Sequence, residues 1–277
     1  MLSFYIFVVI YIIDSNVKNA VWILLFFFLQ HAFGSEYVLN ESALHSDTRE
    51  FSLGGLICDY TTEKTTEMSL TCLIPFQLYE LSVRKLDFSR NLFGLASKVE
   101  WYQSGNEDWM ENNVSLHLGK QLCDHFFLGV NACLLLVDQG DEGLATALFT
   151  ELDGHYRLNE NLILGIRVVN PAGTQLKSAD EYVPLSSSAH LGAAYSPTTK
   201  CLIFTEMDGR IHQPLRLRMG LEFDLYKSFT LRTGFSTMPL MPSWGIGGDI
   251  HHFQYSWGGN LHPILGFSNG ITLTYRW

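Results

Sequence analysis

The side chains best suited to metal chemistry in this sequence stand together near its C-terminal end. Asp249, His251 and His252 are of types that bind metal ions, with one residue between the carboxylate and the histidine pair. Neighbouring side chains of a β-strand point to opposite faces, so two adjacent histidines on a strand would not converge on one ion. We therefore expect no metal site here.

Patterns for other chemistry are weak. The sequence has no G-x-x-x-x-G-K phosphate-binding loop. No serine, histidine and aspartate can be grouped by their spacing into a nucleophilic set. The glycines of Trp244–Gly248 are typical of a strand that bends in a barrel wall. We expect a protein with no enzymatic activity and no cofactor.

Charged residues do follow a pattern over residues 215–226. The odd positions there are apolar, and four of the even positions are charged. A period of two predicts a strand with one apolar and one charged face. Residues 229–236 alternate in the same way, with Arg232 on the polar face. The residues that we expect to face the lumen of a barrel are Arg216, Arg218, Glu222, Asp224 and Arg232.

The same alternation recurs along most of the chain. Residues 114–118, 126–136, 162–168 and 271–277 alternate between apolar residues and polar or small ones. Turn-forming pairs such as Asp208-Gly209 separate these runs. No segment has a helical pattern of any length and none reads as an interdomain linker. The sequence therefore predicts an all-β protein.

Composition narrows the class further. The 277 residues carry a formal charge of −10, with 47% hydrophobic and 17% charged residues. Such a chain is too apolar to be disordered and too acidic to bind nucleic acid through a basic face. We expect no nucleic-acid partner.

The N-terminal segment has the features of an export signal. Residues 2–13 are apolar but end at Asp14, and a second pattern of a short basic region and an apolar run begins at Val17. Ala32 and Gly34 suit a signal-peptidase site. We predict a signal peptide over residues 1–34, with residues 1–16 as an extension of the gene model. The alternative is one kinked anchor helix over residues 2–33.

After cleavage, residues 35–50 are polar and without pattern, so we expect a loose tail or plug, followed by a barrel over residues 51–277. The five cysteines are an odd number without metal-ligand spacing. A bridge between Cys58 and Cys72 is one alternative, and small apolar residues within strands are the other.

The alternating faces favour a membrane barrel over a soluble β-sandwich. A polar interior with a continuous apolar exterior is typical of outer-membrane barrels, whereas sandwiches bury one shared apolar core. With roughly 20 residues per strand and connection, the exported chain predicts a closed antiparallel transmembrane β-barrel of about 12 strands, within a range of 10–14. We expect it in the outer membrane of a Gram-negative cell.

The C-terminal residues resemble the signal that outer-membrane proteins present to the barrel-assembly machinery. This signal ends in an aromatic residue, and the spacing of four residues fits it here. The expected assembly signal consists of Gly270, Leu273, Tyr275 and Trp277.

Several motifs together resemble a family. They are Glu80–Ser82, Asn161–Gly165 leading to Asn170–Ala172, Gly234–Pro239 and His262–Ser268. From about Gln77 to Trp277 the chain resembles the uncharacterised Bacteroidota outer-membrane barrels related to the PorV/PorQ proteins of type IX secretion, within the FadL-like superfamily. The resemblance implies an outer-membrane barrel and leaves its cargo undefined.

Two functions fit these features. The first is a channel or transporter-like barrel for apolar ligands, as the FadL-like resemblance implies. The second is a closed barrel that serves as a scaffold or accessory of a secretion or surface-attachment system, as the PorV/PorQ resemblance implies. Expected partners are outer-membrane lipid, the barrel-assembly machinery and a secretion-system or surface protein.

The charged hairpin has two candidate registers. A three-residue turn pairs Tyr226 with Thr230 and sets Asp224 opposite Arg232. A two-residue turn sets Asp224 opposite Leu231 and so mixes the two faces. We predict the first register, with an ion pair between Asp224 and Arg232.

Overall fold

The computed structural model describes residues 37, 39, 47–56, 66–178, 181–210, 213–226 and 228–277. The predicted signal peptide over residues 1–34 and Cys58 lie outside the described residues. Within the described ranges, no helix is long and apolar enough to cross a membrane.

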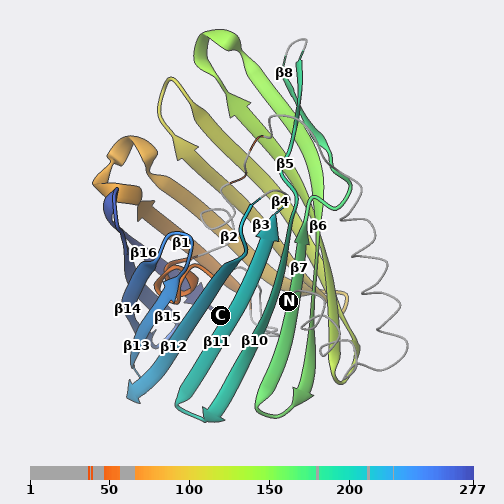
Figure 1. The fold of residues 1–277 in the computed structure, drawn as a ribbon. Helices are drawn as coiled ribbons and strands as arrows, with labels where there is room; N and C mark the ends of the chain where they lie inside the picture. The colour runs from red at the N-terminus through yellow and green to blue at the C-terminus, as the bar shows by residue number, and fades with distance from the viewer. Residues whose placement is uncertain are drawn as a thin grey trace.

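The protein is a closed antiparallel β-barrel (Figure 1). Its wall consists of β1 (Glu67–Ile74), β2 (Val83–Leu92), β3 (Leu95–Gly105), β4 (Met110–Cys123), β5 (Phe126–Asp138), β6 (Leu144–Asn159), β7 (Leu162–Val169), β10 (Ser188–Thr198), β11 (Cys201–Arg210), β12 (Arg216–Tyr226), β13 (Phe229–Ser236), β14 (Met241–Ile250), β15 (Phe253–His262) and β16 (Gly266–Arg276). Pairing of β1 with β16, from Glu67 opposite Arg276 to Ile74 opposite Asn269, closes the ring.

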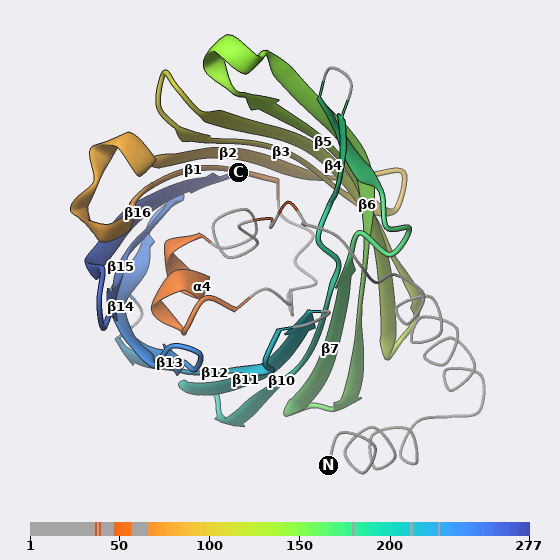
Figure 2. The same cartoon turned by 45° about the horizontal axis from the view of Figure 1, so that its top comes forward.

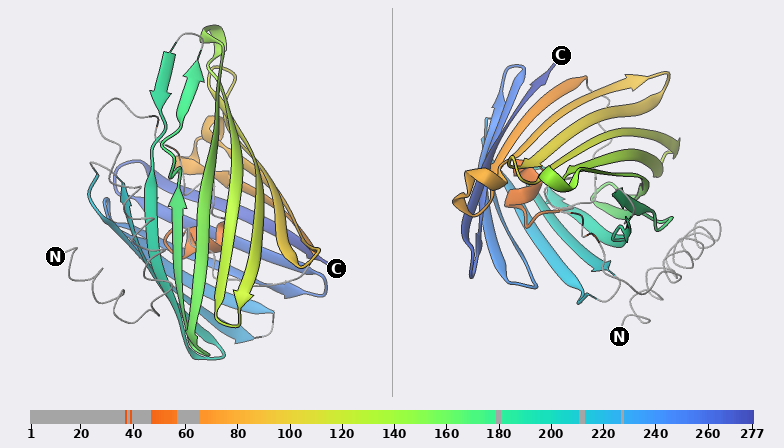
Figure 3. Two further views of the ribbon diagram at one scale, coloured as in Figure 1. Left: turned by 90° about the vertical axis from the view of Figure 1, so that its right-hand side faces the viewer. Right: turned by 90° about the horizontal axis from the view of Figure 1, so that it is seen from above.

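The described wall therefore has fourteen strands, and the expectation of about 12 is too low. The reason is the number of residues that each strand and its connection use. Residues 67–276 supply sixteen strands, so each strand with its connection uses about 13 residues rather than the roughly 20 assumed. The two remaining strands, β8 (Gln175–Ser178) and β9 (Glu181–Pro184), form a hairpin outside the ring that pairs with the end of β6. Figure 3 shows this hairpin beyond the wall.

The two ends of the barrel differ in their connections. At one end, here called the turn end, strand pairs such as β2–β3 and β14–β15 are separated by two residues. At the other, here called the loop end, connections are longer and include η1 (Pro75–Gln77), η2 (Tyr79–Leu81) and η3 (Gly140–Glu142). The connection between β7 and β10 is the longest and contains the β8–β9 hairpin.

Alternation along the strands sorts side chains to two faces. On β12, Leu217, Met219, Leu221, Phe223 and Leu225 are exposed on the outside. The even-numbered residues of the same strand from Arg216 to Asp224 point inward, which confirms an antiparallel barrel with an apolar exterior. This outer band is the surface that lipid would cover.

A short helix lies inside the ring. α4 (Thr48–Ser52) sits within the circle of strands and packs against β13 to β16 (Figure 2). The predicted boundary between residues 50 and 51 falls inside α4, and the first wall strand begins only at Glu67.

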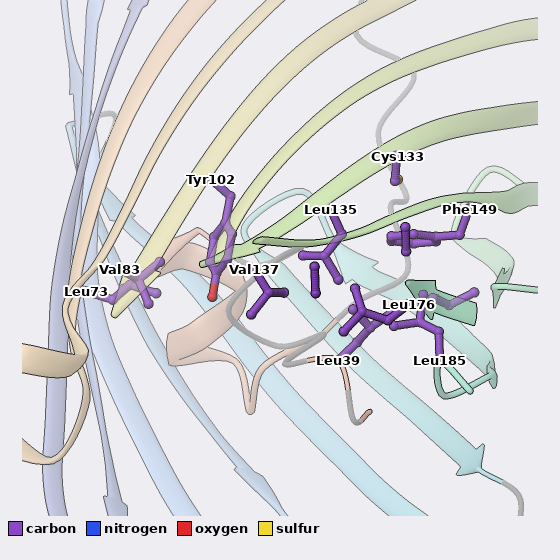
Figure 4. Packing of buried hydrophobic residues seen from close by; sticks show 13 residues of the cluster. Leu39, Leu73, Val83, Tyr102, Cys133, Leu135, Val137, Phe149, Leu176 and Leu185 are labelled. Carbon is purple, nitrogen blue, oxygen red and sulfur yellow. The ribbon is translucent and has the colours of Figure 1, made fainter. Parts of the chain in front are cut away.

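The inner wall has an apolar section near the loop end. Its buried side chains and those of the chain segments against it form one cluster, here called the loop-end cluster (Figure 4). Its members are Leu39, Leu73, Val83, Tyr102, Cys133, Leu135, Val137, Ala145, Ala147, Phe149, Val169, Leu176 and Leu185.

Candidate functional site in the barrel lumen

The five charged residues expected in the lumen lie on the inward face of β12 and β13. Arg218 is only 1% exposed, and its Nη1 lies 2.8 Å from Glu206 Oε1. Arg216 stands opposite Asp208 of β11. Asp224 accepts a hydrogen bond from the Thr230 hydroxyl.

Glu222 and Arg232 form the ion pair of this hairpin, with Arg232 Nε 2.6 Å from Glu222 Oε2. The predicted register, with Asp224 opposite Arg232, is therefore wrong: Glu222 faces Arg232 and Asp224 faces Thr230. Tyr226 pairs with Phe229, and the register shifts by one residue between Asp224 and Tyr226. This bulge absorbs the residue that would otherwise mix the faces, so a two-residue turn keeps the charged face inward.

α4 begins with a capping box. The Asp47 carboxylate accepts hydrogen bonds from the backbone N–H groups of Arg49 and Glu50, and the Glu50 carboxylate accepts one from Asp47 N–H. This reciprocal arrangement satisfies amides at the start of the helix, which otherwise have no partner. The D-x-x-E spacing is the sequence signal that could have located the helix.

Arg49 connects α4 to the wall. Its Nε lies 2.8 Å from Glu222 Oε2 and its Nη2 2.9 Å from Glu222 Oε1, a two-pronged ion pair. Arg232 Nε donates to the same Oε2 oxygen of Glu222, and Arg232 Nη1 donates to the Ser256 hydroxyl at 3.0 Å. Although burial alone would lower it, the pKa of Arg49 is raised by the negative charge of Glu222.

The two acids of the capping box have opposite protonation tendencies. Burial, followed by the negative charge of Asp47, raises the pKa of Glu50 well above its ordinary value of 4.5. Burial also acts to raise the pKa of Asp47, but the hydrogen bond with Glu50 and the charge of Arg49 outweigh it and lower that pKa. We conclude that Asp47 carries the negative charge at the helix start.

Glycines of the wall form the seat of α4. A Cβ atom on Gly258 would lie 2.6 Å from the Thr48 carbonyl oxygen, and one on Gly245 would lie 2.6 Å from Ser52 Cβ. A Cβ on Gly220 would lie 2.8 Å from the Leu53 carbonyl oxygen. These separations are too short for any side chain, so α4 packs directly on the backbone of β14 and β15, and Leu53, which follows the helix, packs on the backbone of β12. Gly245 of the stretch Trp244–Gly248 thus makes room for the helix, a role that the sequence interpretation missed.

Further ion pairs line the inner wall away from α4. On β2 and β3, Lys85 and Lys98 lie 3.1 and 2.9 Å from Glu100 Oε2, and Lys98 lies 3.4 Å from Asp87. His117 Nε2 of β4 lies 2.9 Å from Asp153 Oδ1 of β6. Because positive and negative side chains lie next to one another along this part of the inner wall, most of these charges are compensated locally.

A polar cavity of about 670 Å³ lies between α4, these ion pairs and the turn end. Its lining includes Lys98, His117, Asp153 and Glu222, together with Asn91 near one two-residue turn and Glu160 within another. The interior therefore divides into a polar part toward the turn end and the apolar loop-end cluster.

The N-terminal residues 37 and 39 lie at the loop end. Leu39 belongs to the cluster; its N–H donates to the Ser186 hydroxyl at 3.1 Å, and Arg210 Nη2 donates to its carbonyl oxygen at 3.4 Å. The Tyr37 hydroxyl donates to the Glu111 carboxylate. Burial, followed by the charge of Glu111, raises the pKa of Tyr37. These contacts hold Tyr37 and Leu39 at the loop end of the barrel.

The residues considered for chemistry lie in ordinary structural positions. His251 and His252 form the turn between β14 and β15 rather than part of a strand. Gly266–Gly270 has the G-x-S-x-G spacing of a nucleophile motif, which the sequence interpretation missed, but its Ser268 lies within β16 and accepts a hydrogen bond from Phe76 N–H at 2.9 Å. No group of three histidine, cysteine or acidic side chains suited to a metal occurs within the described ranges.

The residues of the predicted assembly signal end the last strand. Leu273 and Tyr275 point outward from β16, and Trp277, 60% exposed, contacts the rings of Phe88 and Tyr275. Gly270 points inward, toward Thr48 of α4 and Leu73 of β1.

The sequence matches no family model and no curated protein. Its fold is similar to those of outer-membrane channels. The CymD monoaromatic hydrocarbon channel has a TM-score of 0.60 at 9% identity, over 85% of this chain and 98% of that one. A Pseudomonas aeruginosa FadL homologue gives 0.55 at 9% identity, over 87% and 95% of the two chains. The Pseudomonas putida toluene transporter TodX gives 0.51 at 10% identity, over 87% and 93%.

Proposed function

We propose that this chain is an outer-membrane barrel of a Gram-negative cell that acts as a channel or transporter for small apolar molecules. The fold shared with hydrocarbon channels and a FadL homologue supports this proposal. In outer-membrane barrels short turns face the periplasm and longer loops face outside. The loop end would accordingly face the exterior and the turn end the periplasm.

The apolar inner wall at the loop end carries the proposal. The lumen of an outer-membrane barrel is ordinarily polar, yet here Leu135, Val137 and Phe149 point inward and are buried. An apolar section at the outward mouth would take up an apolar solute that arrives from outside. Burial of such a solute there would be driven by the removal of its surface from water.

Passage would require the N-terminal segment to move. Leu39 fills part of the apolar section, and α4 occupies the lumen below it. The structure is therefore the closed state of the proposed channel, and the hydrogen bonds of Leu39 and Arg49 are the contacts that must break.

Uptake of radiolabelled toluene by Gram-negative cells tests this function. Cells that make the chain should accumulate toluene faster than cells with an empty vector. Leu135→Glu, which places a carboxylate in the apolar section, should reduce uptake to the vector level. Cys133→Ser, one inward position away on the same strand, should retain it. Heat-modifiable gel migration verifies that each variant is folded, and wild-type uptake at the vector level would refute the proposal.

The second candidate is a closed barrel that acts as a scaffold, in keeping with the resemblance to PorV/PorQ-related barrels of Bacteroidota. Direct packing of α4 on wall glycines favours a permanently filled lumen. Under this alternative, planar bilayers containing the protein remain silent and toluene uptake stays at background, while a secretion or surface protein co-purifies.

Assembly by the barrel-assembly machinery is a further part of the proposal. Removing Trp277 should slow insertion into the outer membrane more than it lowers the stability of folded barrel. Pulse-labelled insertion measures this, and a normal rate would reduce the terminal motif to an ordinary strand end.

A further inference from the structure

Asn113 of β4 carries a buried amide without a hydrogen-bond partner. The residue is 1% exposed, and neither its Nδ2 nor its Oδ1 forms a hydrogen bond with any residue that the structure describes. Its cross-strand neighbours are Tyr102 on β3 and Leu135 on β5, both members of the loop-end cluster. Buried amides in folded proteins nearly always have partners. The position therefore calls for a partner that the closed state does not supply.

The neighbouring Tyr102 hydroxyl is buried, and among the described residues no well-formed hydrogen bond satisfies it, although the Ser104 side chain lies near it. Figure 4 shows its ring projecting from β3 with the oxygen pointing away from the strand. The two side chains together offer an amide donor, an amide acceptor and a hydroxyl next to apolar surface. One polar group of a bound molecule could satisfy them.

The charged residues beside this pair are already engaged. Lys85, opposite Tyr102 on β2, lies 3.1 Å from Glu100. Glu111, on the loop-end side of Asn113, accepts the hydrogen bond of Tyr37. Of the described residues beside this pair, neither Lys85 nor Glu111 is free to pair with an ionised ligand group, so the arrangement suits an uncharged group.

Leu39 fills part of the loop-end cluster, to which Tyr102 and Leu135 also belong. It belongs to the same cluster but comes from the N-terminal segment rather than from a wall strand, and hydrogen bonds to Ser186 and Arg210 hold its backbone. Its displacement would open apolar space among the wall side chains of this cluster, which includes Tyr102 and the Asn113 neighbour Leu135.

We infer that the transported molecule is an apolar compound bearing one uncharged hydrogen-bonding group, such as a hydroxyl, which Asn113 and Tyr102 bind when Leu39 is displaced. This inference rests on the proposed function and narrows its substrate class. Asn113 would determine specificity by distinguishing such a compound from the plain hydrocarbon.

Toluene and p-cresol test the inference because they differ only by a hydroxyl group. Binding of each radiolabelled compound to the full-length protein in lipid nanodiscs is measured by equilibrium dialysis, with empty nanodiscs subtracted. We expect p-cresol to bind about tenfold more tightly than toluene, the ratio that one net hydrogen bond provides. Asn113→Leu should bring the ratio to about one while toluene binding persists, and Tyr102→Phe should reduce the ratio in part.

Asn112→Leu is the matched control. Asn112 is the adjacent residue on the outward face of β4, and its Oδ1 accepts a hydrogen bond from Gln103 at 3.2 Å. This variant should keep the parental ratio.

The outcomes separate the inference from the function on which it rests. Equal affinities for the two compounds, or a preference unchanged in Asn113→Leu, would overturn the inference and leave transport of apolar molecules in place. Binding of neither compound would overturn the proposed function itself. If Asn113→Leu does not fold, Asn113→Ala and Tyr102→Phe decide by the same ratio.

Discussion

Arg49 of α4 and Glu222 of β12 are joined by two parallel hydrogen bonds, although 173 positions separate them in the sequence. Glu222 is also held by Arg232 of the neighbouring strand. One carboxylate thus serves a wall residue and a residue of the helix inside the lumen. Arg49 can be removed without leaving Glu222 unpaired, which makes the contact between helix and wall testable on its own.

Arg49→Ala should loosen α4 while the barrel stays folded. The loss is expected to be about 1–2 kcal/mol of docking free energy, because a partly exposed charged hydrogen bond is removed. Planar bilayers should show more frequent open events than with the parent, and hydrogen exchange over residues 47–56 should accelerate. Arg49→Lys keeps the charge without the two-pronged geometry and should fall between the two. Parental exchange rates in Arg49→Ala would contradict this.

Gly258→Ala should displace α4 by steric conflict. The added methyl group would lie 2.6 Å from the Thr48 carbonyl oxygen, and overpacking of this kind costs about 1–3 kcal/mol. Hydrogen exchange of α4 and bilayer conductance should both increase. Gly209→Ala is the control, because its methyl group points outward and meets only the flexible end of Leu215. Equal exchange rates and equal conductance in the two variants would contradict the packing of α4 on Gly258.

Docking of α4 should weaken as pH rises above about 4.5. Glu50 has a raised pKa when docked, so the docked state keeps a proton that the free segment has released above its ordinary value of 4.5. The stability from this group is therefore complete below 4.5 and declines as pH rises through the raised pKa. Asp47, whose pKa is lowered, acts in the other direction, and its contribution declines only as pH falls below 3.8.

Glu50→Gln separates these two effects. It should remove the pH dependence of α4 docking above pH 4.5. The weakening of docking below pH 3.8, which protonation of Asp47 causes, should remain. Hydrogen exchange over residues 47–56, corrected for the intrinsic pH dependence of exchange, measures both. An unchanged slope above pH 4.5 in Glu50→Gln would show that another group is responsible.

Arginine substitutions on the outer face of β12 should cost free energy according to depth. Leu221, 39% exposed, lies near the middle of the strand, and Leu225 lies near its turn end. At the bilayer midplane an arginine facing lipid costs about 2–4 kcal/mol, falling to about 0–1 near the interface. Unfolding by urea in lipid vesicles should show Leu221→Arg to be the less stable variant. Equal stabilities would argue against a lipid-covered face.

The two faces of β12 could be predicted from the sequence, because apolar and polar residues alternate over eleven residues. Only one orientation of such a strand keeps its charged side chains out of lipid and its apolar side chains out of the lumen. α4 could not be found in this way. A helix of five residues has no periodicity to read, and its capping box is its one local signal.

The wall glycines on which α4 packs could not be predicted from the sequence either, but for a different reason. Gly245 and Gly258 are ordinary strand glycines until a helix from more than 190 positions earlier is placed on them. The candidate binding role of Tyr102 and Asn113 could be recognised only from the three-dimensional arrangement, because the spacing of residues in a sequence does not show which buried groups lack a hydrogen bond.

The bulge between Asp224 and Tyr226 decides the last prediction, which concerns disulfide trapping in a cysteine-free background. Glu222→Cys with Arg232→Cys, and Asp224→Cys with Thr230→Cys, should each cross-link under mild oxidation, because directly opposed residues bring their Cβ atoms to about 4.5–5.5 Å. Asp224→Cys with Arg232→Cys is displaced by one inward position on β13 and should cross-link poorly. Preferential cross-linking of that third pair would support the three-residue turn and contradict the bulge in this hairpin.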